Sequence, residues 1–369
     1  MDHSKNISHI ASTSLDSRTG MGRVAVHWRE AFIRNGWSYH HFGIDEVPMP
    51  KLKPLWANSA RNKFKKSGIS ESLLLVHEPS AEVFRETSLP TILFSHGLEE
   101  RGAELVPPET DGTRINFKSI LTKPFWRRQA WLREKSLRKC PLLLLINQED
   151  RNYAISHYGR RPEDIFVFRN GVNPSALEPQ QETSTPATVL FYGSWLERKG
   201  KSVLINAALK LAGSGIQVRW LLVGTGRPVA EVLSDWPIGL RSNVVVRAHV
   251  AASDDDSVFE QASIYVLPSF YEGQPLTLLQ AMESGLCVIT TRCCGQKDII
   301  TSGHNGFLIE PGNSDQLAGT IAKILANNQM RIKVSAQAKI DMASRRWPVV
   351  ADEVVERLEQ FFQKNIVTN

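Results

Sequence analysis

Short apolar runs alternate with segments of helical periodicity along the whole chain, and this alternation restricts the fold more than any other feature. The strand-sized runs are 7–11, 72–76, 91–94, 142–146 and 165–168 in the first half, and 188–192, 218–223, 244–248, 264–267 and 287–290 in the second. Between them, segments such as 202–212 and 276–284 carry apolar residues at helical spacing. Strands that alternate with helices predict parallel sheets and an α/β fold.

The length of 369 residues predicts about two domains. The polar segment 178–186 carries two prolines and is the best candidate for a linker. We predict an N-terminal domain over residues 1–180, a C-terminal domain over 187–345, and a final helix within 346–369 that packs back toward the N-terminal domain. Each domain is expected to be doubly wound and Rossmann-like, with a central cleft between them and ligands at the carboxyl ends of the strands.

The positive charge of the chain is concentrated in its first half. The net charge is +6, and basic residues cluster in 51–66 and in 118–139, where Phe125, Trp126 and Trp131 lie among them. This mixture suits an anionic membrane surface or a lipid-linked acceptor, and equally a solvated helix face with buried aromatic residues. No nucleic-acid-binding motif accompanies the charge.

Other segments bear on the location of the protein. No apolar stretch approaches the roughly 18 residues that span a bilayer. The first ten residues lack a secretory signal pattern, and the four cysteines fit neither a disulfide framework nor a metal site. We therefore expect a cytoplasmic protein. The alternative that the basic clusters suggest is a peripheral position at the inner face of the membrane.

The first candidate binding site follows the strand 188–192. Gly193 and Gly200 bound a segment that contains Arg198 and Lys199, and a helix follows. Glycines let a backbone approach a ligand closely, and a helix start supplies free N–H groups beside the two cations. This arrangement predicts a phosphate site, with a solvated basic turn as the alternative.

The second candidate site follows the strand 264–267. Glu272 stands on a loop with Gly273 and Gln274, before a helix that begins at Leu276 and carries Gln280. A carboxylate in this place can accept hydrogen bonds from sugar hydroxyls, and a side chain eight residues later lies about two turns further along. The alternative is a glutamate that caps the helix.

Together these motifs resemble the retaining glycosyltransferases of family 4, which have the GT-B fold. The resemblance covers nearly the whole chain, because the motifs come in the order and spacing of that family. They are Gly20-Met21-Gly22, Asn170-Gly171-Val172-Asn173, Gly193 with Lys199-Gly200, Leu221–Gly226, Glu272-Gly273 with Gln280–Met282 and Gly285, Gly303–Leu308, and Arg346-Trp347.

The resemblance implies roles for the matching residues. Lys199 would bind the donor diphosphate, Glu272 the donor sugar and Gln280 the ribose hydroxyls, while His96 matches the acceptor-side active-site histidine. His77, which ends another strand of the N-terminal domain, is a weaker candidate for the cleft. The other residues expected on the donor side are Gly20, Gly22, Gly193, Arg198, Gly224, His249, Gly273, Gln274 and Leu276.

Two positions depart from the family pattern. Ser194 stands where the family usually has arginine, and Gln280 where it has a second glutamate. Arg198 is the candidate for the missing cation, and an amide still offers a carbonyl acceptor to a hydroxyl. The implied reaction moves a sugar from a nucleotide-diphospho-sugar to a glycan or lipid-linked acceptor with retention, in cell-surface polysaccharide or glycolipid synthesis, and needs no cofactor or metal.

Two other readings stay open on the sequence. One is a catalytically silent scaffold that only binds a nucleotide-sugar, and the other is a sugar-nucleotide epimerase of the same fold. A dehydrogenase is disfavoured because Gly224-Thr225-Gly226 lacks the third glycine of the dinucleotide fingerprint. The donor nucleotide, the sugar, the acceptor and the oligomeric state have no signature in the sequence.

Overall fold

The computed structural model describes residues 5–17, 19–50, 56–69, 73–78, 84, 89–106, 117–181, 186–250 and 255–364. The chain divides into two compact units, which we call the N-terminal and C-terminal units. The N-terminal unit comprises Met1–Leu98, Thr110–Arg169 and Pro348–Asn369, and the C-terminal unit comprises Glu99–Glu109 and Asn170–Trp347.

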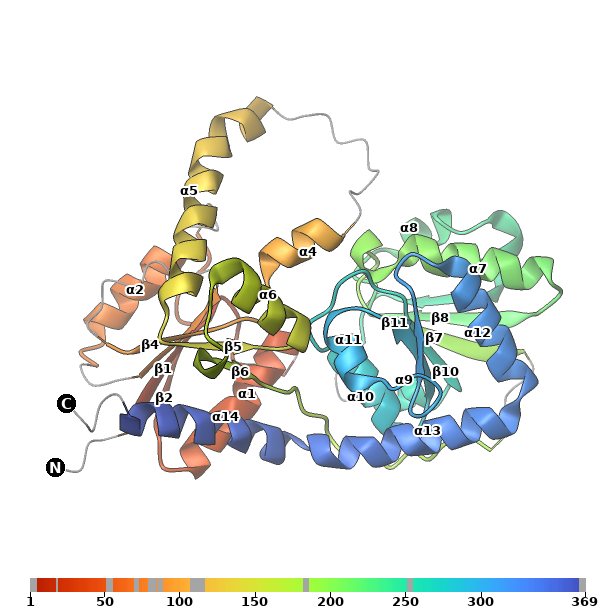
Figure 1. Cartoon of the computed structure of the whole chain (residues 1–369). Helices are drawn as coiled ribbons and strands as arrows, with labels where there is room; N and C mark the ends of the chain where they lie inside the picture. The colour runs from red at the N-terminus through yellow and green to blue at the C-terminus, as the bar shows by residue number, and fades with distance from the viewer. Residues whose placement is uncertain are drawn as a thin grey trace. The chain divides into compact units, whose positions relative to one another are not determined.

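The N-terminal unit is built on a six-stranded parallel sheet (Figure 1). Its strands are β1 (Asn6–Ile10), β2 (Ser38–Phe42), β3 (Leu73–His77), β4 (Thr91–Phe94), β5 (Leu142–Leu145) and β6 (Ile165–Val167), in the order β2-β1-β3-β4-β5-β6. Its helices are α1 (Gly20–Arg34), α2 (Trp56–Lys66), α5 (Phe117–Lys139), α6 (Gln148–Tyr158), the short η3 (Pro162–Asp164) and α14 (Trp347–Phe362), whose first residue belongs to the C-terminal unit. The strand order reverses between β1 and β3.

The C-terminal unit holds a second six-stranded parallel sheet. Its strands are β7 (Ala187–Tyr192), β8 (Val218–Val223), β9 (Val244–Arg247), β10 (Ile264–Leu267), β11 (Cys287–Thr291) and β12 (Phe307–Ile309), in the order β12-β11-β10-β7-β8-β9. Counted from β7, this is the Rossmann order, with its reversal between β7 and β10. The α/β fold with two parallel sheets that the sequence predicts is confirmed.

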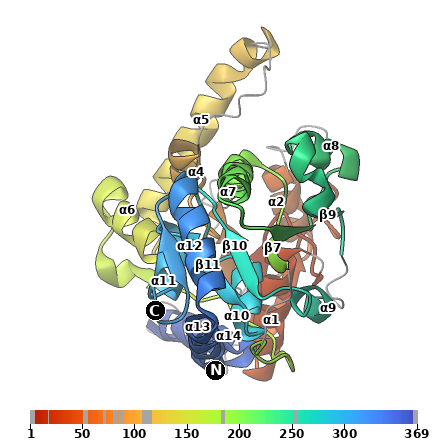
Figure 2. The ribbon, with the colours of Figure 1, turned by 90° about the vertical axis from the view of Figure 1, so that its right-hand side faces the viewer.

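The C-terminal unit also contains helices. They are α4 (Glu99–Leu105), η4 (Glu197–Lys199), α7 (Lys201–Gly213), α8 (Val229–Ser234), η5 (Ile238–Asn243), α9 (Asp255–Phe259), α10 (Leu276–Glu283), α11 (Cys294–Ile299), α12 (Ser314–Ala326), α13 (Asn328–Met342) and η7 (Ala343–Arg345). Among them α7 packs against α12, and α10 packs against α13. In Figure 2, α12 and α13 lie on the side of this unit that faces the viewer.

Burial explains why the central strands are apolar throughout. All residues of β5, β10 and β11 are buried, because helices cover both faces of a parallel sheet. In the N-terminal unit Trp28 and Phe32 of α1 are fully buried against the sheet. A continuous apolar run therefore marks a central strand, which is the signal that the sequence carries.

Some elements carry little of that signal. The edge strand β2 reads Ser-Tyr-His-His-Phe, and only its last residue is buried, so it lacks an apolar run. Helix α13 has its apolar residues spread around its surface and even buries Arg331. The first helix begins at Gly20, with Thr19 as its N-cap, so the glycine motif lies inside its first turn.

The unit boundaries differ from the predicted domain boundaries at two places. Residues 170–181 are bonded to the C-terminal unit. Asn170 donates hydrogen bonds to Gln274. The Lys339 ammonium binds the Leu177 carbonyl and lies 2.8 Å from the Glu178 carboxylate. Residues 99–109 also belong to this unit. The predicted linker is therefore held against α13 over its first part, and its residues 182–185 lie outside the described residues.

The last helix packs on the N-terminal unit. Asp352 of α14 accepts a hydrogen bond from Arg34 at 2.6 Å, and the ring of Phe362 lies edge-on to Trp37. Glu359 pairs with Lys5. None of the helices in the described part of the chain is both long and apolar enough to cross a membrane.

Candidate active site

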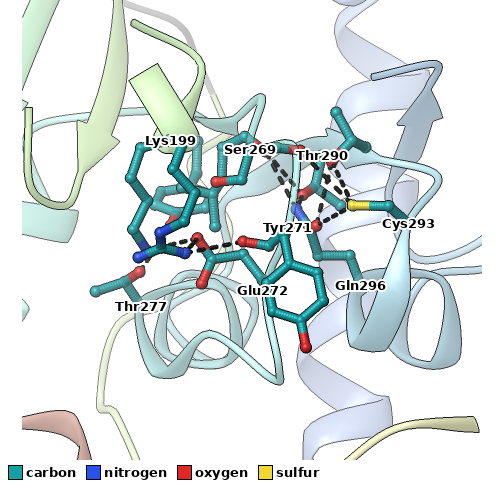
Figure 3. Close-up of polar contacts among 12 residues, drawn as sticks. Lys199, Ser269, Tyr271, Glu272, Thr277, Thr290, Cys293 and Gln296 are labelled. Carbon is teal, nitrogen blue, oxygen red and sulfur yellow. Dashed lines mark hydrogen bonds and ion pairs between the residues drawn. The ribbon is translucent and has the colours of Figure 1, made fainter. Parts of the chain in front are cut away.

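Two loops meet at the strand reversal of the C-terminal sheet. One follows β7 and contains η4, and the other follows β10 and leads into α10. Neighbouring strands on either side of a reversal open a crevice at their carboxyl ends, which is where ligands bind in sheets of this type. Both candidate segments of the sequence therefore come to one place, as Figure 3 shows for Lys199 and Glu272.

The centre of this place is a carboxylate shared by two cations. Glu272 Oε1 lies 2.6 Å from Lys199 Nζ and 3.1 Å from a terminal nitrogen of Arg198. The same Arg198 nitrogen donates to the Tyr271 carbonyl at 2.9 Å. The side chains of Lys199 and Glu272 are 13% and 9% exposed, so this pair is largely shielded from water. The three charges sum to one surplus positive charge.

Electrostatics keeps the Glu272 carboxylate ionised. Burial alone would raise its pKa, but the Lys199 and Arg198 charges outweigh that effect and lower the pKa below its usual value. An ionised carboxylate is a strong acceptor for a hydroxyl donor. Lys199 and Arg198 can therefore bind a ligand that carries more negative charge than the single Glu272 carboxylate.

A glycine fixes the position of the lysine. Gly200 ends η4 in the left-handed region, with φ of 78°, and any Cβ there would collide with the carbonyl of Pro268 on the opposite loop. Gly193 lies beneath the lysine chain, since a Cβ built on it would be 3.7 Å from Lys199 Cε. Helix α7 begins directly after Gly200 without a side-chain cap.

A buried polar network supports the Glu272 loop from behind. Gln296 receives a hydrogen bond from Cys293 at 2.9 Å and donates to the Leu267 carbonyl at 3.3 Å, at the end of β10. The backbone N–H of Gly295 donates to the Glu272 carbonyl at 3.3 Å. These contacts, drawn in part in Figure 3, fix the backbone that presents the carboxylate.

The other predicted donor-side residues of this unit take different positions. Gln274 uses its side-chain carbonyl to accept from the Asn170 N–H at 2.9 Å and from Arg345 at 3.0 Å, so it fastens the loop. Gln280 is buried in α10, with its amide 3.5 Å from the Asn173 carbonyl. Leu276 opens α10, Gly224 follows β8 with φ of 66°, and His249 is exposed beyond β9.

Gly20, Gly22 and His96 lie in the N-terminal unit. Gly22 allows a close approach, since a Cβ there would be 2.8 Å from the Ser14 carbonyl oxygen. His96 follows β4, stacks on Trp28 and lies edge-on to Phe168. Its burial lowers its pKa to about 4, so the ring is neutral at neutral pH.

Three further histidines lie on the neighbouring strands. His77 at the end of β3 is the weaker of the two candidates that the sequence offers, whereas His9 on β1 and His41 on β2 were not singled out from the sequence. The available signal was a histidine at or near the end of each of four consecutive strands. Within the described residues no group of three or more His, Cys, Asp or Glu side chains is arranged to hold a metal ion.

Comparison with known proteins finds similarity to glycosyltransferases in sequence and in fold. Residues 174–341 match the family described as glycosyl transferases group 1. An uncharacterized glycosyltransferase of Haemophilus influenzae is 27% identical over 337 residues, which cover 89% of this chain and 92% of the relative. Other curated relatives match over only about half of their own length.

Solved structures agree in fold. The sucrose-phosphate synthase of Thermosynechococcus elongatus superposes with a TM-score of 0.78 at 16% identity, over 98% of this chain and all of that one. Anabaena Alr3699/HepE in complex with UDP-glucose gives a TM-score of 0.68 at 17% identity, over 96% and 99% of the two chains.

The two Rossmann-like units and the solved structures that superpose on the chain therefore define the GT-B fold. Its residues 174–341 are similar to the glycosyl transferases group 1, and over most of its length the chain is similar to the uncharacterized glycosyltransferase of Haemophilus influenzae.

Proposed function

We propose that the protein transfers a sugar from a nucleotide-diphospho-sugar to a hydroxyl of a glycan or lipid-linked acceptor, with retention of the anomeric configuration. The observation that carries this proposal is the Glu272 carboxylate held between Lys199 and Arg198 at the strand reversal. The surplus positive charge there matches a diphosphate, and the ionised carboxylate matches sugar hydroxyls.

In this mechanism the bond between the anomeric carbon and the β-phosphate oxygen breaks, and negative charge develops on that phosphate. Lys199 and Arg198 stabilise it, with the uncapped start of α7 beside them. The acceptor oxygen bonds to the same face of the anomeric carbon, and its proton passes to the departing diphosphate. Glu272 accepts hydrogen bonds from the hydroxyls of the donor sugar, and Gln280 accepts them from the ribose hydroxyls. Lys199 and Arg198 supply the charge for which other enzymes use a metal ion.

The proposed setting is cell-surface polysaccharide or glycolipid synthesis in the cytoplasm. Relatives named as a phosphatidyl-myo-inositol mannosyltransferase and as a colanic acid biosynthesis glycosyltransferase support a lipid-linked or polysaccharide acceptor. The complex of Anabaena HepE with UDP-glucose supports a UDP-sugar as the first donor to test.

A donor screen tests the function directly. UDP, GDP and ADP are compared by thermal shift, because a ligand that binds the folded state raises its stability. The sugar derivatives of the best binder are then offered, radiolabelled, with extracted lipid and glycan acceptors. Labelled product establishes transfer, whereas tight nucleotide-sugar binding without product under all acceptors would favour the silent scaffold. Interconversion of the donor sugar itself would favour the epimerase.

We further propose that α5 rests on an anionic membrane surface. In both views this helix extends away from the sheet of its own unit (Figures 1 and 2). Arg127 and Arg128 are exposed, Trp131 is 55% exposed, and Lys135 Nζ lies 4.7 Å from the centroid of the Trp131 ring. Basic side chains next to an exposed indole suit the headgroup region of anionic lipids.

The expected result is co-sedimentation with phosphatidylglycerol vesicles at low salt and release at high salt, since screening weakens exposed charges. Arg127→Glu with Arg128→Glu should abolish binding. The matched control is Arg161→Glu, which reverses an exposed arginine outside α5. Equal binding to phosphatidylcholine vesicles, or no binding at low salt, would contradict the assignment.

A further inference from the structure

One segment of the C-terminal unit, residues 170–175, is bonded to α10 at both ends of that helix. Gln274, two residues before α10, accepts a hydrogen bond from the Asn170 N–H at 2.9 Å, and its backbone carbonyl accepts one from the Asn170 amide at 2.8 Å. Glu283, the last residue of α10, accepts a hydrogen bond from the Ser175 N–H at 3.1 Å. The segment therefore lies along α10 from its beginning to its end.

A second segment, Arg345 with Arg346, holds the same two side chains. The Arg345 guanidinium donates to the Gln274 side-chain carbonyl at 3.0 Å. A terminal nitrogen of Arg346 lies 2.9 Å from the Glu283 carboxylate. One arginine therefore binds at the beginning of α10, and its neighbour in the sequence binds at the end.

Backbone pairing joins the two segments to each other. The Val172 N–H donates to the Arg345 carbonyl at 2.8 Å, and Val172 forms a parallel bridge with Arg346. The segments lie at the two ends of the stretch Asn170–Trp347 of the C-terminal unit. We call residues 170–175 and these two arginines the α10 clamp. Because the ends of a stretch of chain are loose unless they are bonded, the clamp orders both ends on one helix.

The contacts of the clamp with α10 are buried. The residues Gln274 and Glu283 are 6% and 1% exposed. In the described part of the chain Glu283 Oε2 is buried without a hydrogen-bond partner, so the carboxylate depends on Oε1, which Ser175 and Arg346 share. Hydrogen bonds and ion pairs are electrostatically stronger in such a setting than in water, and the loss of one partner leaves the other uncompensated.

The clamp is connected to the donor site through the chain itself. Glu272 lies two residues before Gln274, and Gln280 lies three residues before Glu283 on the same helix. The Glu272 carboxylate contacts the Lys199 ammonium at 2.6 Å. A binding site works only when such groups are held within about 0.5 Å of their places. A displacement at either end of α10 therefore moves one of the two donor-site side chains.

We propose that Arg345 and Arg346 are positioning residues of the donor site. Arg345 fixes the position of the Glu272 carboxylate, and Arg346 fixes the position of Gln280. The inference rests on the proposed function, in which Glu272 contacts the donor sugar and Gln280 contacts the ribose. The two arginines therefore act on different parts of the donor, although they are neighbours in the sequence.

The first test needs no ligand. Glutamate is labelled with ¹³C at its carboxyl carbon, and Glu272→Gln identifies the Glu272 signal. Burial raises the pKa of Glu272, but the charges of Lys199 and Arg198 outweigh this effect and hold the pKa below its usual value. Gln274→Leu removes the acceptor of Arg345 without a change of charge, so the Glu272 signal should titrate at a higher pH as the carboxylate leaves the two cations. An unchanged titration would overturn the proposal for Arg345.

The second test separates the two arginines by what each loses. Nucleotide affinity is measured by calorimetry with whichever of UDP, GDP and ADP binds the wild type, and the chemical step by single turnover with the donor and acceptor of the screen. Arg345→Met should slow the chemical step about fivefold or more and leave the nucleotide affinity within about twofold. Arg346→Met should weaken nucleotide binding about fivefold and slow the chemical step less than Arg345→Met does. The reverse pattern, or wild-type values in both variants, would refute the assigned roles.

Further variants separate positioning from a loss of folding. Arg346→Met leaves a buried carboxylate without its cation, which is strongly destabilising. Arg346→Met combined with Glu283→Gln removes that charge, so it should stay folded and still bind nucleotide weakly. Arg346→Lys keeps a cation and should recover part of the affinity. The control is Arg161→Met, which removes an exposed arginine paired with Asp164 at 2.8 Å in the N-terminal unit and should behave like the wild type.

The ligand-free titration distinguishes the failure of this inference from the failure of the proposed function. If UDP, GDP and ADP all fail to bind while Gln274→Leu shifts the Glu272 titration, the proposed function fails and the effect of the clamp on Glu272 stands. If the wild type transfers sugar while the arginine variants match it in both measurements, the inference alone is refuted.

Discussion

Lys199→Ala is expected to lower the turnover number at least about 100-fold while the protein stays folded, as when one preorganised charge partner of a transition state is removed. The Lys199 ammonium lies 2.6 Å from Glu272 in a largely buried setting, where a charge is worth more than in water. Arg198 remains in this variant, so residual activity is expected. The measurement is the steady-state rate with saturating donor.

Lys201→Ala is the matched control for this experiment. Lys201 lies two residues further on, and its ammonium binds Asp235 at 3.2 Å instead of Glu272. Its loss should leave turnover nearly unchanged. Wild-type turnover in purified Lys199→Ala would contradict the assignment of this lysine to the donor diphosphate.

Glu272→Gln is expected to lower the rate of the chemical step about 10- to 100-fold at saturating donor. The carboxylate is the acceptor placed for the donor sugar, and a hydrogen bond to a charged group is worth about 1.5–3 kcal/mol. The amide also leaves Lys199 and Arg198 without their counter-ion. Single-turnover kinetics measures the effect, and retained UDP binding shows that the fold is intact.

Gln280→Glu provides the contrast in the same unit. The amide of Gln280 lies 3.5 Å from the Asn173 carbonyl, at the limit of a hydrogen bond, so little is lost when the amide is replaced. A carboxylate accepts from ribose hydroxyls more strongly, and donor affinity should rise several-fold, or about 1 kcal/mol. If Gln280→Glu abolished donor binding, or Glu272→Gln kept full turnover, the assigned roles would be wrong.

The core of the candidate site was predictable because its signals are local. Lys199 lies between glycines in the loop after a buried strand, and Glu272 lies in the loop after another. In a parallel sheet such positions share one edge, so the sequence implied that both loops lie at the carboxyl edge of the sheet, but not that they are neighbours. The resemblance to a family implied roles for these motifs, and the structure gave the distance between Lys199 and Glu272.

Contacts between distant segments could not be read in the same way. Gln274 has a sequence position typical of a ligand contact, yet its carbonyl is used by Asn170 and Arg345. Arg198 looked like one cation of a basic turn, and only the fold shows that it reaches Glu272 and the Tyr271 carbonyl. A side chain's partners depend on which segments the fold brings beside it, and one sequence alone does not contain that information.

The sequence by itself determined the α/β class, the two parallel sheets and the residues at the carboxyl ends of their strands, because burial on both faces forces continuous apolar runs. Only the tertiary structure decided the strand order. That order places β7 beside β10 around Lys199 and Glu272, and β1 beside β3 around His9 and His77. The order arises from the packing of helices on whole sheets, and this packing energy is spread over contacts between residues far apart in the chain.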